Sequence, residues 1–127
     1  MNDGELLGSS DFVSLHVPLT DETRHLIGAG ELALMKSTGY LINTARGGLL
    51  DHAALSAALA ANRLAGAALD VFESEPDLPD ALLATENVVL TPHMASSALE
   101  AKQDQRDMIL ANLDAHFAGR PLPTPIP

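Results

Sequence analysis

The hydrophobic positions of this chain form short apolar runs that alternate with longer stretches rich in alanine and leucine. A short apolar run between turn residues is typical of a buried strand, and apolar residues three or four apart indicate a helix. We predict strands at residues 11–16, 40–44, 65–71 and 87–90, and helices at residues 31–36, 53–61, 81–83 (a single turn) and 97–117. Strands that alternate with helices predict an α/β fold with a parallel sheet and right-handed crossovers.

Polar and glycine residues mark where several of these elements should begin and end. Asp51 is the predicted N-cap of the helix at 53–61, and Ser97 with Glu100 forms a capping-box pattern at the start of the longest helix. Gly119 is expected to end that helix. The glycines at 28–30 superficially suggest a phosphate loop, but they follow no strand directly, so we interpret them as a turn.

The overall charge restricts the class of partner. The 127 residues include 7 basic and 17 acidic side chains, a formal net charge of −10. Nucleic acids and anionic membranes bind basic faces, so we expect neither as a partner. The chain has no cysteine, which excludes disulfides and thiolate metal sites, and we assign no metal ligands. The first thirty residues show no leader and no run reaches membrane length, so we expect a cytoplasmic protein.

Chemically useful side chains follow the predicted strands. Arg46 comes after the second strand, Asp70 and Glu75 after the third, and His93 after the fourth. The carboxyl ends of parallel strands share one edge of a sheet, where open α/β sheets bind their ligands. Arg46 beside two glycines suggests a carboxylate or phosphate site, although a surface arginine paired with an acid is an equal alternative.

These residue types together favour redox chemistry beside a carboxylate. Arginine binds a carboxylate bidentately, and a histidine oriented by a carboxylate transfers a proton at neutral pH. No side chain supplies the electrons, so the reaction requires a cofactor.

Four ordered motifs resemble those of the D-isomer-specific 2-hydroxyacid dehydrogenase family, which includes phosphoglycerate and glyoxylate/hydroxypyruvate reducing enzymes. They are residues 14–20 (SLHVPLT), 43–48 (NTARGG), 69–76 (LDVFESEP) and 91–95 (TPHMA). The resemblance implies the second half of a Rossmann-type doubly wound parallel sheet plus a long C-terminal helix. The corresponding division is a half dinucleotide-binding domain at 1–95 and a return helix with a proline-rich tail at 96–127.

The resemblance also implies individual roles. Arg46 would bind the substrate carboxylate, His93 would exchange a proton with the substrate oxygen, and Glu75 would hold His93 as an imidazolium. The implied cofactor is NAD, with NADP not distinguished, and its groove would be lined by Val17, Pro18, Thr23, Thr44, Ala45, Arg46, Asp70, His93, Met94, Ala95 and Ser96. The implied substrate is a small 2-keto or 2-hydroxy acid.

Several residues have plainer interpretations. One alternative is that His93 only caps the last helix, and another is that Asp70 only caps a turn. His16 is equally well a packing residue at a strand end or a residue that touches the cofactor. We expect Glu73, the rival of Glu75, to be a solvated loop acid. Surface or helix-face roles are predicted for His25, His52 and His116.

The glycine-rich turn and the ribose-binding acid of a complete dinucleotide domain do not occur in these 127 residues. We therefore predict weak cofactor binding by the chain alone. We also predict an unpaired edge at the first strand, and a homo-oligomer or a partner chain that supplies the missing half. The alternative to a dehydrogenase is a non-catalytic remnant or a nucleotide-binding interaction module of the same family.

Overall fold

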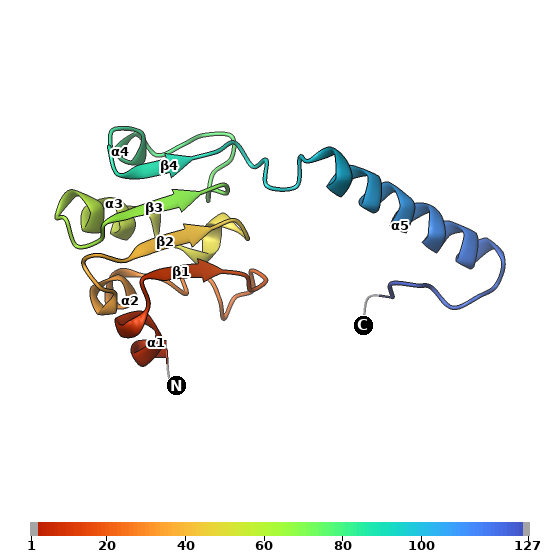
Figure 1. The fold of residues 1–127 in the computed structure, drawn as a ribbon, viewed down its shortest axis with the longest axis horizontal. Helices are drawn as coiled ribbons and strands as arrows, with labels where there is room; N and C mark the ends of the chain where they lie inside the picture. Colours follow the sequence, from red (N-terminus) through yellow and green to blue (C-terminus); the bar gives the residue numbers. More distant parts are fainter. Residues whose placement is uncertain (1–2, 126–127) are drawn as a thin grey trace. The chain divides into compact units, whose positions relative to one another are not determined.

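The computed structural model describes residues 3–125, which fall into two compact units divided after His93. The first unit contains four strands and their connecting helices (Figure 1). In chain order they are α1 (Asp3–Ser9), β1 (Phe12–Leu15), α2 (Ala29–Leu34), β2 (Tyr40–Asn43), the 3₁₀ helix η1 (Gly47–Leu49), α3 (His52–Ala60), β3 (Gly66–Leu69), α4 (Asp80–Leu83) and β4 (Val88–Leu90). The second unit contains α5 (Leu99–Phe117).

The four strands form one parallel sheet in the order β1-β2-β3-β4, which confirms the predicted α/β fold. In this sheet Leu41 of β2 pairs with Val13 on one side and Ala67 on the other. Each strand pairs with the next one in the sequence, so every crossover is local. Strand β1 has β2 as its one neighbour among the described residues, which leaves its outer side as an edge.

The core lies on one face of the sheet. Alternate strand residues such as Val13, Leu15 and Leu41 are buried against leucines from the helices, including Leu32 of α2 and Leu55 of α3. This alternation follows from the two-residue period of a strand, and the helical leucines complete the apolar layer.

The other face of the sheet has exposed hydrophobic side chains. Phe12 and Tyr40 stack with ring centroids 5.4 Å apart, yet Phe12 is 67% exposed. Val89 of β4 is also exposed, and a hollow of 410 Å³ lies along the strands between Phe12 and Val89. Apolar surface of this kind is typical of a contact face.

Two predictions about the ends of helices had different outcomes in this unit. The Asp51 carboxylate accepts a hydrogen bond from the Ala54 N–H at 2.9 Å, which confirms it as the N-cap of α3. The turn predicted at 28–30 is wrong, because Gly28 is the N-cap of α2 and Gly30 lies inside that helix. The Glu31 side chain accepts a hydrogen bond from the Gly28 N–H and stabilises this early start.

The second unit consists of α5 and the segment that follows it. The capping box predicted for Ser97 and Glu100 is wrong, because the N-cap of α5 is Ala98 and no side chain caps it. Gly119, with φ 66°, follows the helix as predicted. Asn112 donates a hydrogen bond to the Thr124 hydroxyl at 2.7 Å, which holds the proline-containing segment against the helix.

Among residues 3–125, no helix combines the length and the apolar composition that crossing a membrane requires.

Candidate active site

The carboxyl ends of the four strands lie along one edge of the sheet (Figure 1), and predicted site residues of the first unit follow each of them in the sequence. Val17 and Pro18 follow β1, Arg46 follows β2, Asp70 follows β3, and His93 follows β4. This is the expected consequence of parallel pairing, which brings residues distant in the sequence to one edge of the sheet.

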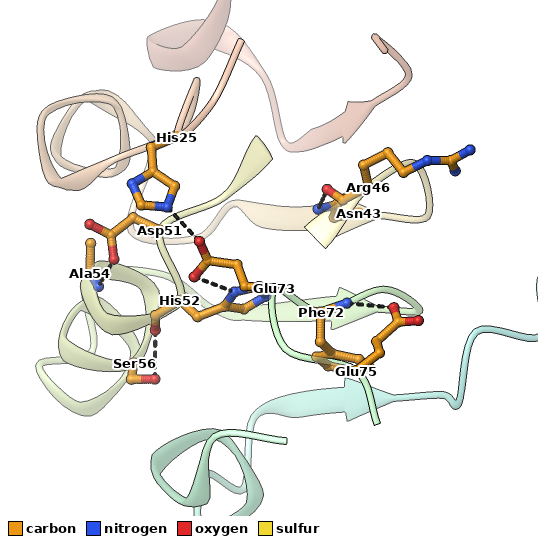
Figure 2. Close-up of polar contacts among 10 residues, drawn as sticks. All are labelled: His25, Asn43, Arg46, Asp51, His52, Ala54, Ser56, Phe72, Glu73 and Glu75. Carbon is orange, nitrogen blue, oxygen red and sulfur yellow. Dashed lines mark hydrogen bonds and ion pairs between the residues drawn. The ribbon is translucent and has the colours of Figure 1, made fainter. Parts of the chain in front are cut away.

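A buried asparagine shapes the loop that carries Arg46. Asn43, the last residue of β2, is fully buried, and its amide donates to the Arg46 carbonyl at 2.9 Å and accepts from the Ala45 N–H at 3.1 Å. These two bonds fix the backbone on both sides of the loop. The exposed Arg46 side chain then extends past the end of the sheet (Figure 2), where its Nη1 donates to the Ala45 carbonyl at 2.6 Å.

Glu75 and His93 form a hydrogen-bonded pair. One carboxylate oxygen of Glu75 lies 2.7 Å from Nδ1 of His93, and the other accepts the Phe72 N–H at 3.0 Å. These two hydrogen bonds, the one to His93 first, hold the pKa of the Glu75 carboxyl below its ordinary value. His93 has φ 50°, a left-handed conformation that is uncommon outside glycine and is frequent at functional sites.

Asp70 joins the ends of β3 and β4. It is buried, its N–H donates to the Asn43 carbonyl, and its carboxylate accepts a hydrogen bond from the Thr91 hydroxyl. A buried carboxylate at this edge needs such partners.

Two cavities meet at Arg46. One, of 380 Å³, is lined by Arg46, Glu75 and His93, together with Arg24 and Glu73. The three residues predicted to carry the chemistry therefore border one space rather than opposite sides of the unit. The other cavity, of 740 Å³, is lined by His16, Val17, Pro18, Leu19, Ala45 and Arg46.

The structure places the other predicted cofactor residues in several ways. Thr23 shapes the turn after β1, because its hydroxyl donates to the Pro18 carbonyl at 2.7 Å and accepts the Thr20 N–H. Thr44 is exposed at the end of β2. Met94, Ala95 and Ser96 belong to the second unit, so their contribution to the groove stays a prediction.

One prediction for a residue next to the site is wrong, and another is narrowed. Glu73 is not a solvated loop acid, because its carboxylate lies 2.6 Å from His25 Nε2 and 3.2 Å from His52 Nδ1. Of the surface and helix-face roles expected for His52 the structure shows the second, since His52 begins α3 and its side chain is 4% exposed. Figure 2 shows Glu73 between the two histidines.

Comparison with known proteins identifies relatives of this chain. The family model for the D-isomer specific 2-hydroxyacid dehydrogenase, NAD binding domain, matches residues 2–95. A glyoxylate reductase from Korarchaeum cryptofilum is 53% identical over 116 residues, which are 91% of this chain and 35% of that protein. A hydroxyphenylpyruvate reductase from Plectranthus scutellarioides is 44% identical over 122 residues, 96% of this chain and 39% of that protein.

Solved structures of dehydrogenases and reductases also resemble this chain. D-mandelate dehydrogenase from Rhodotorula graminis in its apo form superimposes with a TM-score of 0.92 and 37% identity, covering 100% of this chain and 37% of that one. An NADPH-dependent glyoxylate/hydroxypyruvate reductase from Sinorhizobium meliloti, in complex with NADP and malonate, gives a TM-score of 0.91 at 38% identity. The match covers 98% of this chain and 39% of that one. The chain thus spans less than half the length of these relatives.

The cavity beside β1 and β2 fits part of a nicotinamide dinucleotide. Its volume of 740 Å³ lies in the range of ligand pockets, and Val17, Pro18 and Ala45 give it an apolar wall that suits a flat ring. Arg46 borders both this cavity and the one lined by Glu75 and His93. A ring held here would therefore lie next to the Glu75–His93 pair.

Proposed function

Because the chain belongs to the D-isomer-specific 2-hydroxyacid dehydrogenase family, as part of its NAD binding domain, we propose that it contributes the catalytic edge of an oxidoreductase. The reaction interconverts a small 2-keto acid and a D-2-hydroxy acid with NAD or NADP. The observation that supports this most directly is the Glu75–His93 hydrogen bond in a cavity that Arg46 also lines.

Arg46 binds the substrate carboxylate in this proposal. Its guanidinium is exposed at the cavity, and its backbone is held by Asn43. A planar guanidinium matches a carboxylate with two parallel hydrogen bonds, which also fixes the orientation of the carbon next to it. The molecule's charge of −10 does not prevent this, because one well-placed cation determines the local potential.

His93 moves the proton. Its Nδ1 faces Glu75, so Nε2 is the nitrogen left to donate a proton to the substrate carbonyl oxygen and to take it back in the reverse direction. The lowered pKa of Glu75 keeps that carboxylate ionised, so it can accept a hydrogen bond from Nδ1 of His93 and orient the ring. A nicotinamide cofactor, when bound, supplies or accepts the hydride.

The cofactor groove follows the two cavities. We assign its apolar wall to Val17, Pro18 and Ala45, and a polar contact near the reacting carbon to Asp70. The remaining assignments carried from the family pattern are Thr23, Thr44, Met94, Ala95 and Ser96. We assign no residue of this chain to recognition of the substituent on the substrate's third carbon. We also assign none to the selection of NAD or NADP.

We further propose that the chain acts together with more polypeptide, from a longer protein, from a partner chain or from a second copy. It spans about a third of the length of the glyoxylate reductase from Korarchaeum cryptofilum. The exposed face of the sheet and the open edge of β1 are the surfaces such a partner would cover.

A chimera tests the proposed activity. The 116 aligned residues of this chain would replace the matching segment of the Korarchaeum cryptofilum glyoxylate reductase, and NADH- and NADPH-dependent reduction of glyoxylate, hydroxypyruvate and pyruvate would be measured. We expect turnover, and about a 100-fold loss of kcat in both Arg46→Ala and His93→Ala. Arg106→Ala and His116→Ala are matched controls on α5, because both residues are exposed there, and should leave kcat unchanged.

The same chimera distinguishes the alternative function. A folded chimera that binds NADH without turnover, or Arg46→Ala and His93→Ala variants with near-normal rates, would contradict the catalytic proposal. The first of these results would instead support a nucleotide-binding module without catalytic activity.

A further inference from the structure

Glu73 joins three segments that are far apart in the sequence. Its carboxylate lies 2.6 Å from Nε2 of His25, 48 residues away, and 3.2 Å from Nδ1 of His52, 21 residues away. His25 precedes α2, His52 begins α3, and Glu73 follows β3 (Figure 2). One side chain therefore connects the loop after β3 to both neighbouring segments.

The buried partner in this cluster is oriented. The His52 side chain is 4% exposed, its ring centroid lies 6.0 Å from that of Phe72, and its Nε2 has no hydrogen-bond partner among the described residues. A proton on Nε2 would be a buried donor without an acceptor, which is costly. The proton therefore belongs on Nδ1, which donates it to Glu73.

The charge of Glu73 suits this arrangement. Partial burial raises the pKa of the Glu73 carboxyl, and the hydrogen bonds to His25 and His52 lower it. Their lowering outweighs the effect of burial, so the pKa lies below its ordinary value. An ionised carboxylate has two oxygens that both accept, and each of them faces one histidine.

The backbone next to Glu73 is in contact with the acid/base pair. The N–H of Phe72, the preceding residue, donates to Glu75 at 3.0 Å, and Glu75 holds His93 through its other oxygen. A shift of the Phe72 backbone would therefore move Glu75 away from His93.

The next peptide, between Phe72 and Glu73, packs against the loop of Arg46. A Cβ atom on Gly47 would lie 2.0 Å from the Phe72 carbonyl carbon, so the two backbones touch closely. The His25 N–H donates to the Gly48 carbonyl at 2.8 Å, which ties the histidine's own backbone to this loop. Both sides of the proposed site thus depend on where residues 72 and 73 lie.

We propose that Glu73 is a positioning residue, whose carboxylate is anchored by His25 and His52. It holds the backbone of Phe72 and Glu73 where the Phe72 N–H keeps Glu75 against His93 and the Phe72–Glu73 peptide packs on the Arg46 loop. This role rests on the proposed function, because it serves the same acid/base pair. It requires no contact between Glu73 and the substrate.

Hydrogen exchange in the 127-residue chain tests the anchor without measuring activity. In Glu73→Ala we expect the Phe72 amide to exchange roughly 10-fold faster, while core amides such as that of Leu41 keep their protection. Glu73→Gln should keep most of the protection, because its amide oxygen accepts from His52 and its NH₂ group donates to Nε2 of His25 in the tautomer that leaves Nε2 as an acceptor. Asp77→Ala, which removes an exposed acid from the same loop, is the matched control and should change nothing.

A gentler variant covers the case in which Glu73→Ala does not fold. His25→Asn removes one of the two anchoring bonds, and asparagine tolerates the left-handed backbone of His25, with φ 52°. It should accelerate exchange at Phe72 by a smaller factor than Glu73→Ala. An unchanged Phe72 amide in these variants, or a loss of protection shared equally by Leu41, would overturn the proposal.

Turnover in the glyoxylate reductase chimera completes the test. Glu73→Ala should lower kcat roughly 10-fold, and Glu73→Gln should restore most of it. If the unsubstituted chimera has no activity, the proposed function fails, while the exchange experiment still decides whether Glu73 holds the segment. If the chimera is active and Glu73→Ala retains full kcat, the positioning role fails alone.

Discussion

The carboxylate of Glu75 makes the candidate site sensitive to acid. Its pKa is lowered from the ordinary value of 4.5 by the hydrogen bonds to His93 and Phe72. A carboxyl with a depressed pKa stabilises the fold fully above its ordinary pKa, and this contribution disappears as the pH falls through the lowered pKa. Loss of the contact should therefore destabilise the chain mainly at neutral pH.

The measurement is the free energy of unfolding by urea for the wild type and Glu75→Gln, from about pH 7 down to about pH 3. We expect the wild type to be the more stable at neutral pH and the difference to shrink as the pH falls. A difference that stays constant over the whole range would contradict this assignment.

Sequence reasoning found Glu75 and His93 because each follows a strand whose end could be located. The cluster around Glu73 could not be found in this way. Its partners lie 48 and 21 residues away, and no local pattern indicates that His52, at the start of a helix, turns inward. Asn43 was also missed as a structural residue, although a polar residue at the end of a buried strand is the one available signal.

At the scale of single elements, we expect opposite effects on stability from substitutions at the two predicted helix caps, Asp51 and Ser97. Asp51→Ala should lower the free energy of unfolding by about 1 kcal/mol, because Asp51 caps α3. Ser97→Ala should have no measurable effect, because α5 begins at Leu99 with no side-chain cap. Both values come from urea unfolding, with Asp51→Asn as the control that retains a capping oxygen.

Two glycines give a second contrast between elements. Gly47→Ala should cost about 1–3 kcal/mol of unfolding free energy, because the new Cβ would clash with backbone at Phe72, 2.0 Å away. Gly30→Ala, within α2 and with no atom near its Cβ position, should stabilise by about 0.5–1 kcal/mol. Equal effects of the two substitutions would contradict the close contact between the loops.

The strands were predictable because their apolar runs are bounded clearly, and the observed sheet begins and ends within one or two residues of the predicted strands in each case. The helix α1 was not predicted, since Asp3–Ser9 contains two glycines and a single buried residue, Leu7. The 3₁₀ helix η1 was also missed, because the pair Gly47 and Gly48 predicts a tight turn without helical structure. Their helical form follows from packing on Phe72 and Leu19 rather than from propensity.

For the whole molecule, the exposed face of the sheet predicts association. Phe12 and Val89 lie exposed at opposite ends of the 410 Å³ hollow. We expect the 127-residue chain to sediment as more than a monomer at micromolar concentration, since an apolar face and an open edge favour pairing.

Lysine substitutions test which surface is responsible. Phe12→Lys and Val89→Lys should shift the chain towards the monomer, whereas Leu83→Lys, at an exposed position on α4, should not. A wild-type chain that sediments as a monomer with a cooperative melting transition would contradict the expected association.

The parallel sheet of the first unit could be derived from the sequence, because alternating elements leave few topologies for it. What covers its open face could not, because an exposed Phe12 shows that a surface is apolar and carries no information about the partner. The net charge of −10 narrows the class of partner without selecting one.

The sequential strand order β1-β2-β3-β4 has a consequence for synthesis on the ribosome. Each new strand finds its neighbour already made, so the sheet can grow in one direction as the chain emerges, without waiting for distant segments. His93, which completes the proposed acid/base pair, leaves the ribosome after all four strands. In a nascent chain, the parallel sheet would thus form before His93 joins the candidate site.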